Sequence, residues 1–563
     1  MQHLTPDVSS PRAPAPRLSP EQLKRCRQLL ETEQVDQIAY EFGFSDEQQC
    51  LAALGNAVGL DVVDLSKVEP DAVALTDFPV RLIHRHNVFP IRRSGGMLTL
   101  AVGNPFDVQA VDAVSAATGD TVTPVLASIN EVSNLIKSQL GVGAQTIEGL
   151  IAQSDEDEVQ LLDEISFDGS DAAEAAQQAS VVRLVNDILT EAVNARASDI
   201  HMESQASGMK IRYRVDGILQ TQPVPPELDR FQAAIVSRLK IMSKMNIAEK
   251  RVPQDGRIKL IVSGREIDIR VSVIPMLHGE GVVMRVLDKD AMSFSLRGIG
   301  MEQDTYDAFH HLIRQPHGIV LVTGPTGSGK TTTLYSALAE IRSERTKIIT
   351  TEDPIEYQLD GINQIQVHAK VGLTFAASLR SILRHDPDVV LVGEIRDHET
   401  AENAVQASLT GHMVFSTLHT NDAAGAFMRL VDMGVEPFLV TSTVEGVMAQ
   451  RLVRTLCNAC KEAYMPAHDE VPDDFPIDLA KPVFRPKGCR ACNGVGYSGR
   501  LGIYELLATT DKVRQLANER KPTHEIKAAA IEGGMRTLRE DGWLKVLTGR
   551  TSIDEVLRVT KAE

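Results

Sequence analysis

Residues 318–332 read GIVLVTGPTGSGKTT, and this stretch decides the fold of the part of the chain around it. An apolar run at residues 319–322 leads into a loop that matches GxxxxGK followed by Thr, in the expected order of strand, loop and helix. Glycines in such a loop let backbone N–H groups turn inward and surround phosphate oxygens at a helix N-terminus. The stretch therefore predicts an α/β fold in which a parallel sheet carries a nucleotide site.

The loop residues have distinct expected roles in holding ATP and Mg²⁺. Lys330 is expected to act in catalysis by reaching the β and γ phosphates, and Thr331 is expected to hold Mg²⁺. The residues expected around the phosphates are Gly324, Pro325, Thr326, Gly327, Ser328, Gly329, Lys330, Thr331 and Thr332. A chance glycine loop is a poor explanation, because strand and helix patterns flank this loop on the correct sides.

A second apolar strand ends beside a carboxylate. Residues 389–397 read VVLVGEIRD and present Glu394 just beyond the apolar run. A parallel sheet delivers side chains at this end of its strands to the ligand crevice. Glu394 is therefore expected to help hold Mg²⁺, directly or through water.

Two further polar groups follow apolar stretches. TTEDPIEY comes after the strand-like KIIT and offers Glu352, Asp353 and Glu356, and His419 follows the apolar start of MVFSTLHTND. By pattern alone, the acids could equally cap a helix or lie on the surface. A lone histidine is more often an ordinary core or surface residue than a functional one.

Upstream of the loop, two strand patterns each have one polar face. MKIRYRV and EIDIRVSV alternate apolar and polar side chains, so each strand is expected to bury one face and expose the other. Arg257 follows the turn PQDGR, and from the pattern alone the polar positions form a solvated sheet face. The polar positions of the second strand are Glu266, Asp268, Arg270 and Ser272. A preceding helical stripe consists of Val181, Val185, Ile188, Leu189 and Ala192.

The order of these motifs resembles a known family. The phosphate loop, the acidic box TTEDPIEY, the box DPDVVLVGEIRD and the histidine box STLHTND resemble the secretion ATPase superfamily, which drives type II secretion and type IV pilus assembly. The resemblance includes SDIHMES, EKRVPQDGR, QRLVRTLC and GYSGRLGIYE, and it covers about residues 177–563. It implies an α/β fold with a RecA-like P-loop ATPase core, a PAS-like α+β domain before it, a zinc-binding insert and a separate N-terminal α/β module.

The resemblance also implies roles for five residues. Arg257 and Arg270 become candidates to stabilise charge on the nucleotide phosphates. Glu352 and Glu394 become candidates for water activation and Mg²⁺ binding, and His419 becomes a candidate sensor of the γ-phosphate. The resemblance further implies a ring-shaped homo-hexamer, nucleotide-driven domain motion and a platform partner at the inner membrane.

Six cysteines fall into two groups. Two CxxC pairs, in LCNACKEA and GCRACNGV, are separated by 28 residues and suit a tetrahedral structural Zn²⁺ site, with disulfides as the alternative. The four are Cys457, Cys460, Cys489 and Cys492. A tetracysteine insert of this kind resembles that of the secretion and pilus extension motors. The retraction motors of the superfamily lack it, so the resemblance favours extension or secretion. Cys26 and Cys50 lie elsewhere and are expected to be buried thiols.

The chain is expected to contain several domains. Its 563 residues are too many for one core, and the clearest boundary is a segment with ten acids and no Lys or Arg between Lys137 and Arg183. This composition predicts a flexible linker, although LLDEI within it could be a docking motif. The expected parts are a disordered N-terminus (1–16), an N-terminal docking module (17–142), the acidic linker (143–176), the PAS-like domain (177–290), the RecA-like ATPase core (291–455), the tetracysteine zinc subdomain (456–505) and a C-terminal helical region (506–563).

The N-terminal module carries a weaker resemblance. AVGNPFDVQAVDAV looks like the N-terminal domain of these motors, some of which bind cyclic di-GMP through tandem RLG-type motifs. This chain has RLSPEQLKR, which lacks that glycine and has no clear second copy. We therefore expect docking to a membrane-anchored assembly protein and no binding of cyclic di-GMP.

Charge and hydropathy exclude some classes of function. The net charge of -18 argues against wrapping nucleic acid as the main task, although the linker supplies over half of that charge. No apolar run approaches the roughly 18 residues that span a bilayer, and the first residues do not resemble a signal peptide. We expect a cytoplasmic protein that reaches the inner membrane through its partners.

The expected function is that of an ATP-hydrolysing motor that drives assembly of a type IV pilus or a type II secretion pseudopilus. One alternative is a related ring ATPase that moves nucleic acid or serves another secretion system. Another is a nucleotide-gated scaffold that does not hydrolyse ATP. The sequence does not separate a type II from a type IV filament.

Overall fold

The computed structural model describes residues 18–31, 42, 44, 47–65, 68, 70–75, 78–140, 179–262, 264–288, 294–467, 470–476, 482–492 and 494–561. The chain divides into two compact units, Met1–Val262 with Asp268–Val286 and Ser263–Ile267 with Leu287–Glu563. The expected disordered N-terminus, the acidic linker and the LLDEI motif lie outside the described residues. Of the helices within the described ranges, none is both long and apolar enough to cross a membrane.

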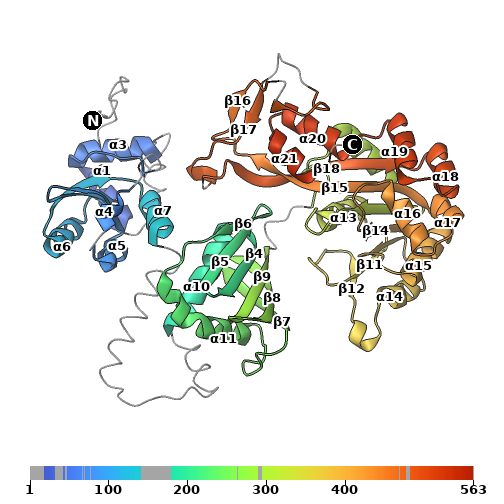
Figure 1. Ribbon diagram of the computed structural model, residues 1–563, viewed down its shortest axis with the longest axis horizontal. Helices are drawn as coiled ribbons and strands as arrows, with labels where there is room; N and C mark the ends of the chain where they lie inside the picture. Colours follow the sequence, from blue (N-terminus) through green and yellow to red (C-terminus); the bar gives the residue numbers. More distant parts are fainter. Residues whose placement is uncertain are drawn as a thin grey trace. The chain divides into compact units, whose positions relative to one another are not determined.

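The N-terminal module surrounds a three-stranded sheet of order β1-β2-β3 with helices (Figure 1). Strands β1 and β2 are antiparallel, and β2 and β3 are parallel. Cys26 and Cys50 are buried, as predicted, and burial raises the pKa of Cys50 to about 12. The elements are α1 (Pro20–Glu31), α3 (Glu47–Val58), α4 (Ala72–Leu75), α5 (Val80–His86), β1 (Val88–Ser94), β2 (Met97–Val102), α6 (Val108–Thr118), β3 (Thr121–Leu126) and α7 (Ile129–Leu140).

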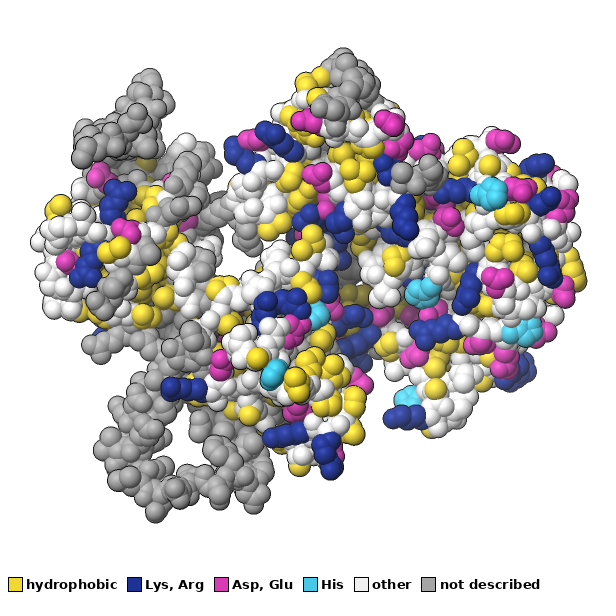
Figure 2. All heavy atoms as spheres, in the orientation of Figure 1, with side chains coloured by type: hydrophobic (Ala, Val, Ile, Leu, Met, Phe, Trp, Pro, Cys, Tyr) yellow, Lys and Arg dark blue, Asp and Glu magenta, His cyan; other side chains and the backbone are white. Residues whose placement is uncertain are grey.

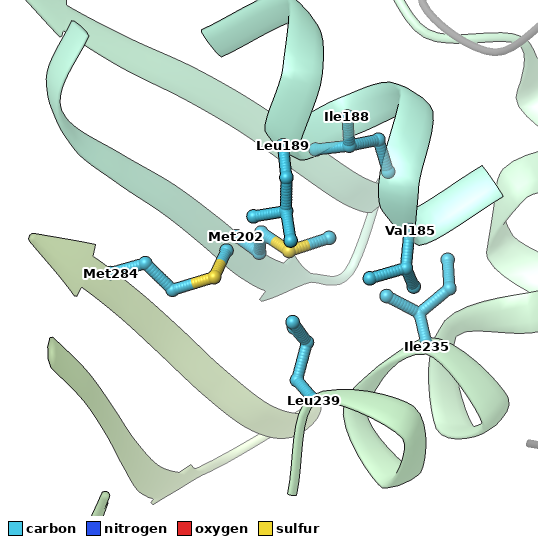
Figure 3. Close-up of a pocket in the computed structure, with 7 residues that line it drawn as sticks. All are labelled: Val185, Ile188, Leu189, Met202, Ile235, Leu239 and Met284. Atoms are coloured by element: carbon cyan, nitrogen blue, oxygen red, sulfur yellow. The ribbon is translucent and has the colours of Figure 1, made fainter. Parts of the chain in front are cut away.

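The region expected to form the PAS-like domain packs two helices on one face of a six-stranded sheet of order β6-β5-β4-β9-β8-β7. Seven apolar side chains from α10, α11, β4 and β9 point toward one another, and none is more than 2% exposed (Figure 3). They are Val185, Ile188, Leu189, Met202, Ile235, Leu239 and Met284. The elements are α10 (Ala179–Asn194), β4 (Ala197–Gln205), β5 (Gly208–Val215), β6 (Ile218–Thr221), η2 (Pro226–Phe231), α11 (Gln232–Met242), β7 (Gln254–Val262), β8 (Arg265–Met276) and β9 (Gly279–Asp288).

The predicted stripe and strand faces of this domain are largely confirmed. All five stripe residues on α10 are buried, and so are Ile267, Ile269, Val271 and Val273 of β8. Two positions differ. Val215 is only half-buried at the end of β5. Asp268 was expected to be exposed but is 2% exposed, because Arg257 on the neighbouring strand covers and binds its carboxylate.

The second compact unit is built on a seven-stranded sheet of order β12-β11-β13-β14-β10-β15-β18. Every neighbouring pair from β12 to β15 is parallel, as predicted, and β18 alone runs antiparallel, beside β15. Strands β10, β11, β13 and β14 are entirely buried because helices cover both faces, which explains the continuous apolar runs of β10 and β13. The elements up to β15 are α12 (Gln303–Leu312), β10 (Gly318–Thr323), α13 (Lys330–Ile341), β11 (Ile348–Glu352), β12 (Asn363–Gln366), η3 (Ala369–Val371), α14 (Phe375–Ile382), β13 (Val389–Val392), α15 (His398–Leu409), β14 (Met413–Leu418), α16 (Gly425–Asp432), α17 (Pro437–Thr443) and β15 (Val444–Leu456).

The C-terminal part of this unit completes the sheet and adds helices (Figure 1). Strand β18 continues through Ala508, so it crosses the position at which the sequence divides a zinc subdomain from a helical region. The four cysteines lie between β15 and β18, beyond the end of β15. The remaining elements are β16 (Glu462–Tyr464), β17 (Val483–Arg485), η5 (Arg490–Cys492), β18 (Tyr497–Ala508), α18 (Asp511–Asn518), α19 (Thr523–Glu532), α20 (Leu538–Leu547) and α21 (Ile553–Val559).

Candidate nucleotide-binding site

The phosphate loop leaves the carboxyl end of β10 and runs directly into α13. Gly324 has φ 147, and a Cβ atom built on it would lie 2.6 Å from the carbonyl oxygen of Gln450, so both backbone conformation and space require glycine there. Gly329, with φ 91, occupies the position just before the helix. The loop thus brings backbone N–H groups to the N-terminus of α13, where the helix dipole favours an anion.

Lys330 is the first residue of α13 and turns back over the loop. Its Nζ donates to the carbonyl oxygens of Gly324 at 2.7 Å and Pro325 at 3.2 Å. Burial lowers the pKa of Lys330, the charge of Glu394 raises it, and the charge of Arg451 lowers it further. Thr331 follows on the first turn with an exposed side chain. Lys330 therefore already lies among the groups that a phosphate would meet.

Glu394 and His419 meet at the carboxyl ends of two adjacent strands. Glu394 lies two residues beyond β13, and His419 is the first residue after β14. The Glu394 carboxylate pairs with Nε2 of His419 at 3.4 Å and with Nη2 of Arg396 at 2.6 Å. The side chain of Glu394 is 14% exposed, whereas that of His419 is 48% exposed. The sheet thus assembles an acid, a histidine and Lys330 from separate motifs.

Glu352 ends β11 with its carboxylate in the interior. It is 4% exposed and accepts hydrogen bonds from the hydroxyl of Tyr335, from Oγ1 of Thr350 at 2.5 Å and from Nε2 of Gln364 at 3.1 Å. Asp353 is exposed and Glu356 is half-buried. No helix begins within residues 347–362, all of which are described, so these acids do not cap a helix there.

The four predicted metal ligands form one cluster. Their sulfur atoms all lie within 4.8 Å of one another, and the distance is 3.8 Å between Cys457 and Cys489 and between Cys460 and Cys492. A disulfide needs about 2.05 Å, so these thiols are not paired by covalent bonds. Although burial raises the pKa of Cys492, N–H groups of Cys489 and Gly496 donate to its sulfur at 3.1 Å and bring that pKa to about 7. Four converging sulfur atoms fit a metal ion.

Comparison with known proteins identifies the family. A family model described as type II/IV secretion system protein matches residues 174–558, and a model of the MshEN domain matches residues 58–141. The chain belongs to the type II/IV secretion system protein family. It is 43% identical to the type II secretion system protein E of Xanthomonas campestris pv. campestris over 556 residues, covering 97% of this chain and 96% of that protein. It is 42% identical to the type IV pilus assembly ATPase PilB of Myxococcus xanthus over 526 residues, covering 92% and 91%.

A solved structure supports the fold. The X-ray structure of the Legionella pneumophila ATPase DotB matches with a TM-score of 0.50 and 23% identity, over 67% of this chain and 95% of that one. At this identity the likeness concerns the fold alone. Family and fold together confirm the predicted class, and this chain is a secretion ATPase of mixed α/β fold.

In this secretion ATPase, the two predicted arginines lie in the PAS-like domain. Arg257 on β7 donates from Nε to Oδ1 of Asp268 at 2.6 Å, and a second guanidinium nitrogen pairs with the other carboxylate oxygen. The Arg257 side chain is nevertheless 49% exposed, and Arg270 on β8 is half-buried. Both guanidinium groups thus belong to the polar face of the six-stranded sheet.

Sequence reasoning missed two groups that hold the phosphate loop. Gln450 on β15 is 2% exposed, donates from Nε2 to the carbonyl of Ser328 at 2.8 Å, and accepts from Oγ1 of Thr333 at 2.7 Å. Thr323, the last residue of β10, shares a hydroxyl contact of 2.8 Å with Thr420 and accepts from its backbone N–H at 2.8 Å. The available signal for Gln450 was a single amide directly after the apolar run VMA in VEGVMAQRLV.

Proposed function

We propose that this secretion ATPase is an ATP-hydrolysing motor that powers assembly of a type IV pilus or of a type II secretion pseudopilus. The observation that carries the proposal is the grouping of Lys330, Glu394 and His419 at the carboxyl ends of parallel strands. The relatives named for type II secretion and for type IV pilus assembly each cover more than nine tenths of this chain, which supports a filament motor of either kind.

The phosphate loop would hold the ATP phosphates through backbone N–H groups and Lys330. On phosphate binding, the Lys330 ammonium would exchange its present carbonyl partners for phosphate oxygens. Thr331 and Glu394 would hold Mg²⁺, which neutralises charge on the phosphates when bound. Glu394 now pairs with Arg396 and His419, so a metal ion would compete with the Arg396 guanidinium and the His419 ring for one carboxylate.

The two carboxylates would have different tasks. We assign water activation to Glu352, because Tyr335, Thr350 and Gln364 fix the orientation of its carboxylate. His419 would sense the γ-phosphate through its contact with Glu394, since any change in the partners of Glu394 alters that ion pair. The catalytic set thus comprises Lys330, Glu352, Glu394 and His419 within one compact unit.

Arg257 and Arg270 would complete the set from the PAS-like domain. Their guanidinium groups would meet the charge that develops on the γ-phosphate when this domain closes over the nucleotide. The buried carboxylate of Asp268 would orient Arg257, because it binds two guanidinium nitrogens at once. Hydrolysis would then depend on domain closure.

The tetracysteine cluster would hold a structural Zn²⁺ ion. All four ligand positions of a tetrahedral ion are taken by Cys457, Cys460, Cys489 and Cys492, which leaves no position for a reacting water. The ion would join the end of β15 to the segment before β18.

We further propose a homo-hexamer on the cytoplasmic side of the inner membrane, bound to a platform protein in that membrane. The N-terminal module would dock to a membrane-anchored assembly protein and would not bind cyclic di-GMP, because RLSPEQLKR lacks the RLG glycine. Nucleic acid is not an expected partner. On the face shown in Figure 2, Lys and Arg side chains are interspersed with Asp and Glu instead of forming one basic surface.

Phosphate release by the purified full chain tests this function against its alternatives. With ATP and Mg²⁺, the motor is expected to release phosphate at a rate that added double-stranded DNA leaves unchanged. Stimulation by DNA would favour a motor that moves nucleic acid. Nucleotide binding without any phosphate release would favour the non-hydrolysing scaffold.

A further inference from the structure

Arg451 lies against the phosphate loop, in the motif QRLVRTLC, to which the sequence alone assigns no role at the site. It follows Gln450 on β15, next to β10 in the sheet. Its Nη1 atom would be 3.1 Å from a Cβ atom built on Gly324, the first glycine of the loop. The guanidinium group therefore packs directly beside the backbone that surrounds the phosphates.

Two backbone carbonyls hold the guanidinium in this place. Nη1 donates to the carbonyl oxygen of Gln450 at 2.9 Å, and Nη2 donates to that of Asn421 at 2.8 Å. Asn421 belongs to the histidine box that also contains His419. A guanidinium group has five N–H donors, so three remain for other acceptors. Arg451 thus touches both the phosphate loop and the histidine box and retains donors for a third partner.

Two cations flank the same glycine. The Lys330 ammonium binds the Gly324 carbonyl, while Nη1 of Arg451 would lie 3.1 Å from a Cβ atom built on the same residue. Burial lowers the pKa of Arg451, and the positive charge of Arg451 in turn lowers the pKa of Lys330. Glu505 and Asp422 raise the pKa of Arg451 through their charge, and Glu505 also pairs with Lys527. Two half-buried like charges that act on each other in this way are stabilised by a nearby anion.

We propose that Arg451 is a phosphate-binding residue of the nucleotide site, acting as a second cation beside Lys330. This inference rests on the proposed function and adds a phosphate contact that the proposed set of catalytic residues does not include. A guanidinium group suits a phosphate because its planar donors can bind two phosphate oxygens at once. The residue lies within the same compact unit as the loop, so the contact needs no closure of the PAS-like domain.

The test compares Arg451→Gln with the parent in the full chain, by competition of AMP, ADP and ATP against a fluorescent ADP analogue. Loss of a hydrogen-bonded charge is expected to weaken ADP and ATP binding about 10- to 100-fold. AMP, which lacks the β and γ phosphates, is expected to change less than about threefold. Arg429→Gln is the matched control, because Arg429 is an exposed residue of α16 and the net charge changes equally.

A second variant keeps the test decisive if Arg451→Gln unfolds. Arg451→Lys retains the charge but loses the paired donors, so an intermediate loss for ADP and ATP is expected while AMP binding is kept. Unchanged ADP and ATP affinities in a folded variant would overturn the proposal. Equal losses for all three nucleotides would also overturn it, because they indicate a structural role. Absence of ATP hydrolysis in the parent would refute the proposed function, whereas these binding results concern Arg451 alone.

Discussion

Replacing Gln450 with Leu removes the side-chain hydrogen bonds that link β15 to the phosphate loop and to α13. Leucine has a similar volume, so Gln450→Leu keeps the interior filled while it removes both side-chain hydrogen bonds. The carbonyl of Ser328 and the hydroxyl of Thr333 then lose a partner inside the protein. The hydroxyl of Thr333 also contacts Tyr504, so it keeps one interaction.

The expected cost follows from these two groups. A buried polar group that loses its partner costs about 1–3 kcal/mol, and the remaining contact of Thr333 places its share at the lower end. The free energy of unfolding is therefore expected to fall by about 2–4 kcal/mol. Because the lost bonds hold the loop in its binding conformation, ATP affinity is expected to fall about tenfold as well.

Urea unfolding monitored by tryptophan fluorescence measures the first effect. The chain has one tryptophan, Trp543, which is 1% exposed on α20 of the same unit. Gln515→Leu is the matched control, because Gln515 is exposed on α18 and its replacement is expected to change stability by less than about 0.5 kcal/mol. In a double-mutant cycle, Thr333→Val is expected to reduce the cost of Gln450→Leu, since each change removes the partner that the other leaves unsatisfied.

One result would refute the reasoning about Gln450. If Gln450→Leu has the same midpoint urea concentration of unfolding as the parent and binds ATP with the same affinity, the Gln450 amide does not stabilise the phosphate loop. A loss of stability with unchanged ATP affinity would restrict its role to folding.

Two further predictions concern the metal and the arginines. The purified, freshly reduced protein is expected to contain about one zinc ion per chain by metal analysis, because four thiols converge on one point; a folded chain without zinc would contradict this site. Arg257→Ala and Arg270→Ala are each expected to depress steady-state ATP turnover far more than ATP affinity, because contacts made in the transition state add little to ground-state binding. Circular dichroism serves as the folding control for both variants. Turnover equal to that of the parent would contradict a catalytic role and would leave these arginines as solvated residues of a sheet face.

The sequence predicts the parallel sheet because its strands lie in a fully covered layer. Such strands need apolar side chains on both faces, so runs such as residues 319–322 and 389–392 are continuous and easily recognised. The polar residue that follows each run is then carried to one edge of the sheet. This rule places Glu394 and His419 at the same edge of the sheet, and they meet because β13 and β14 are neighbours in the strand order.

The same rules fail to predict the burial of a polar side chain where that burial depends on a contact with another strand or helix. Alternation assigns Asp268 to an exposed face, but burial there depends on Arg257 from the neighbouring strand, and the pattern within one strand does not contain that neighbour. Gln450 is similar, because its two partners are 122 and 117 residues away in the sequence. The burial of Glu352 likewise depends on Tyr335 and Gln364, which lie on other elements.

ATP hydrolysis by Lys330→Ala tests the central claim most directly. The measurement is phosphate release from ATP and Mg²⁺ by the full chain, with circular dichroism to confirm that the variant is folded. Removing the ammonium takes away the charge that neutralises the phosphates, so hydrolysis is expected to be abolished while the fold remains. Turnover equal to that of the parent in the folded variant would contradict the assignment of this loop as the site of hydrolysis.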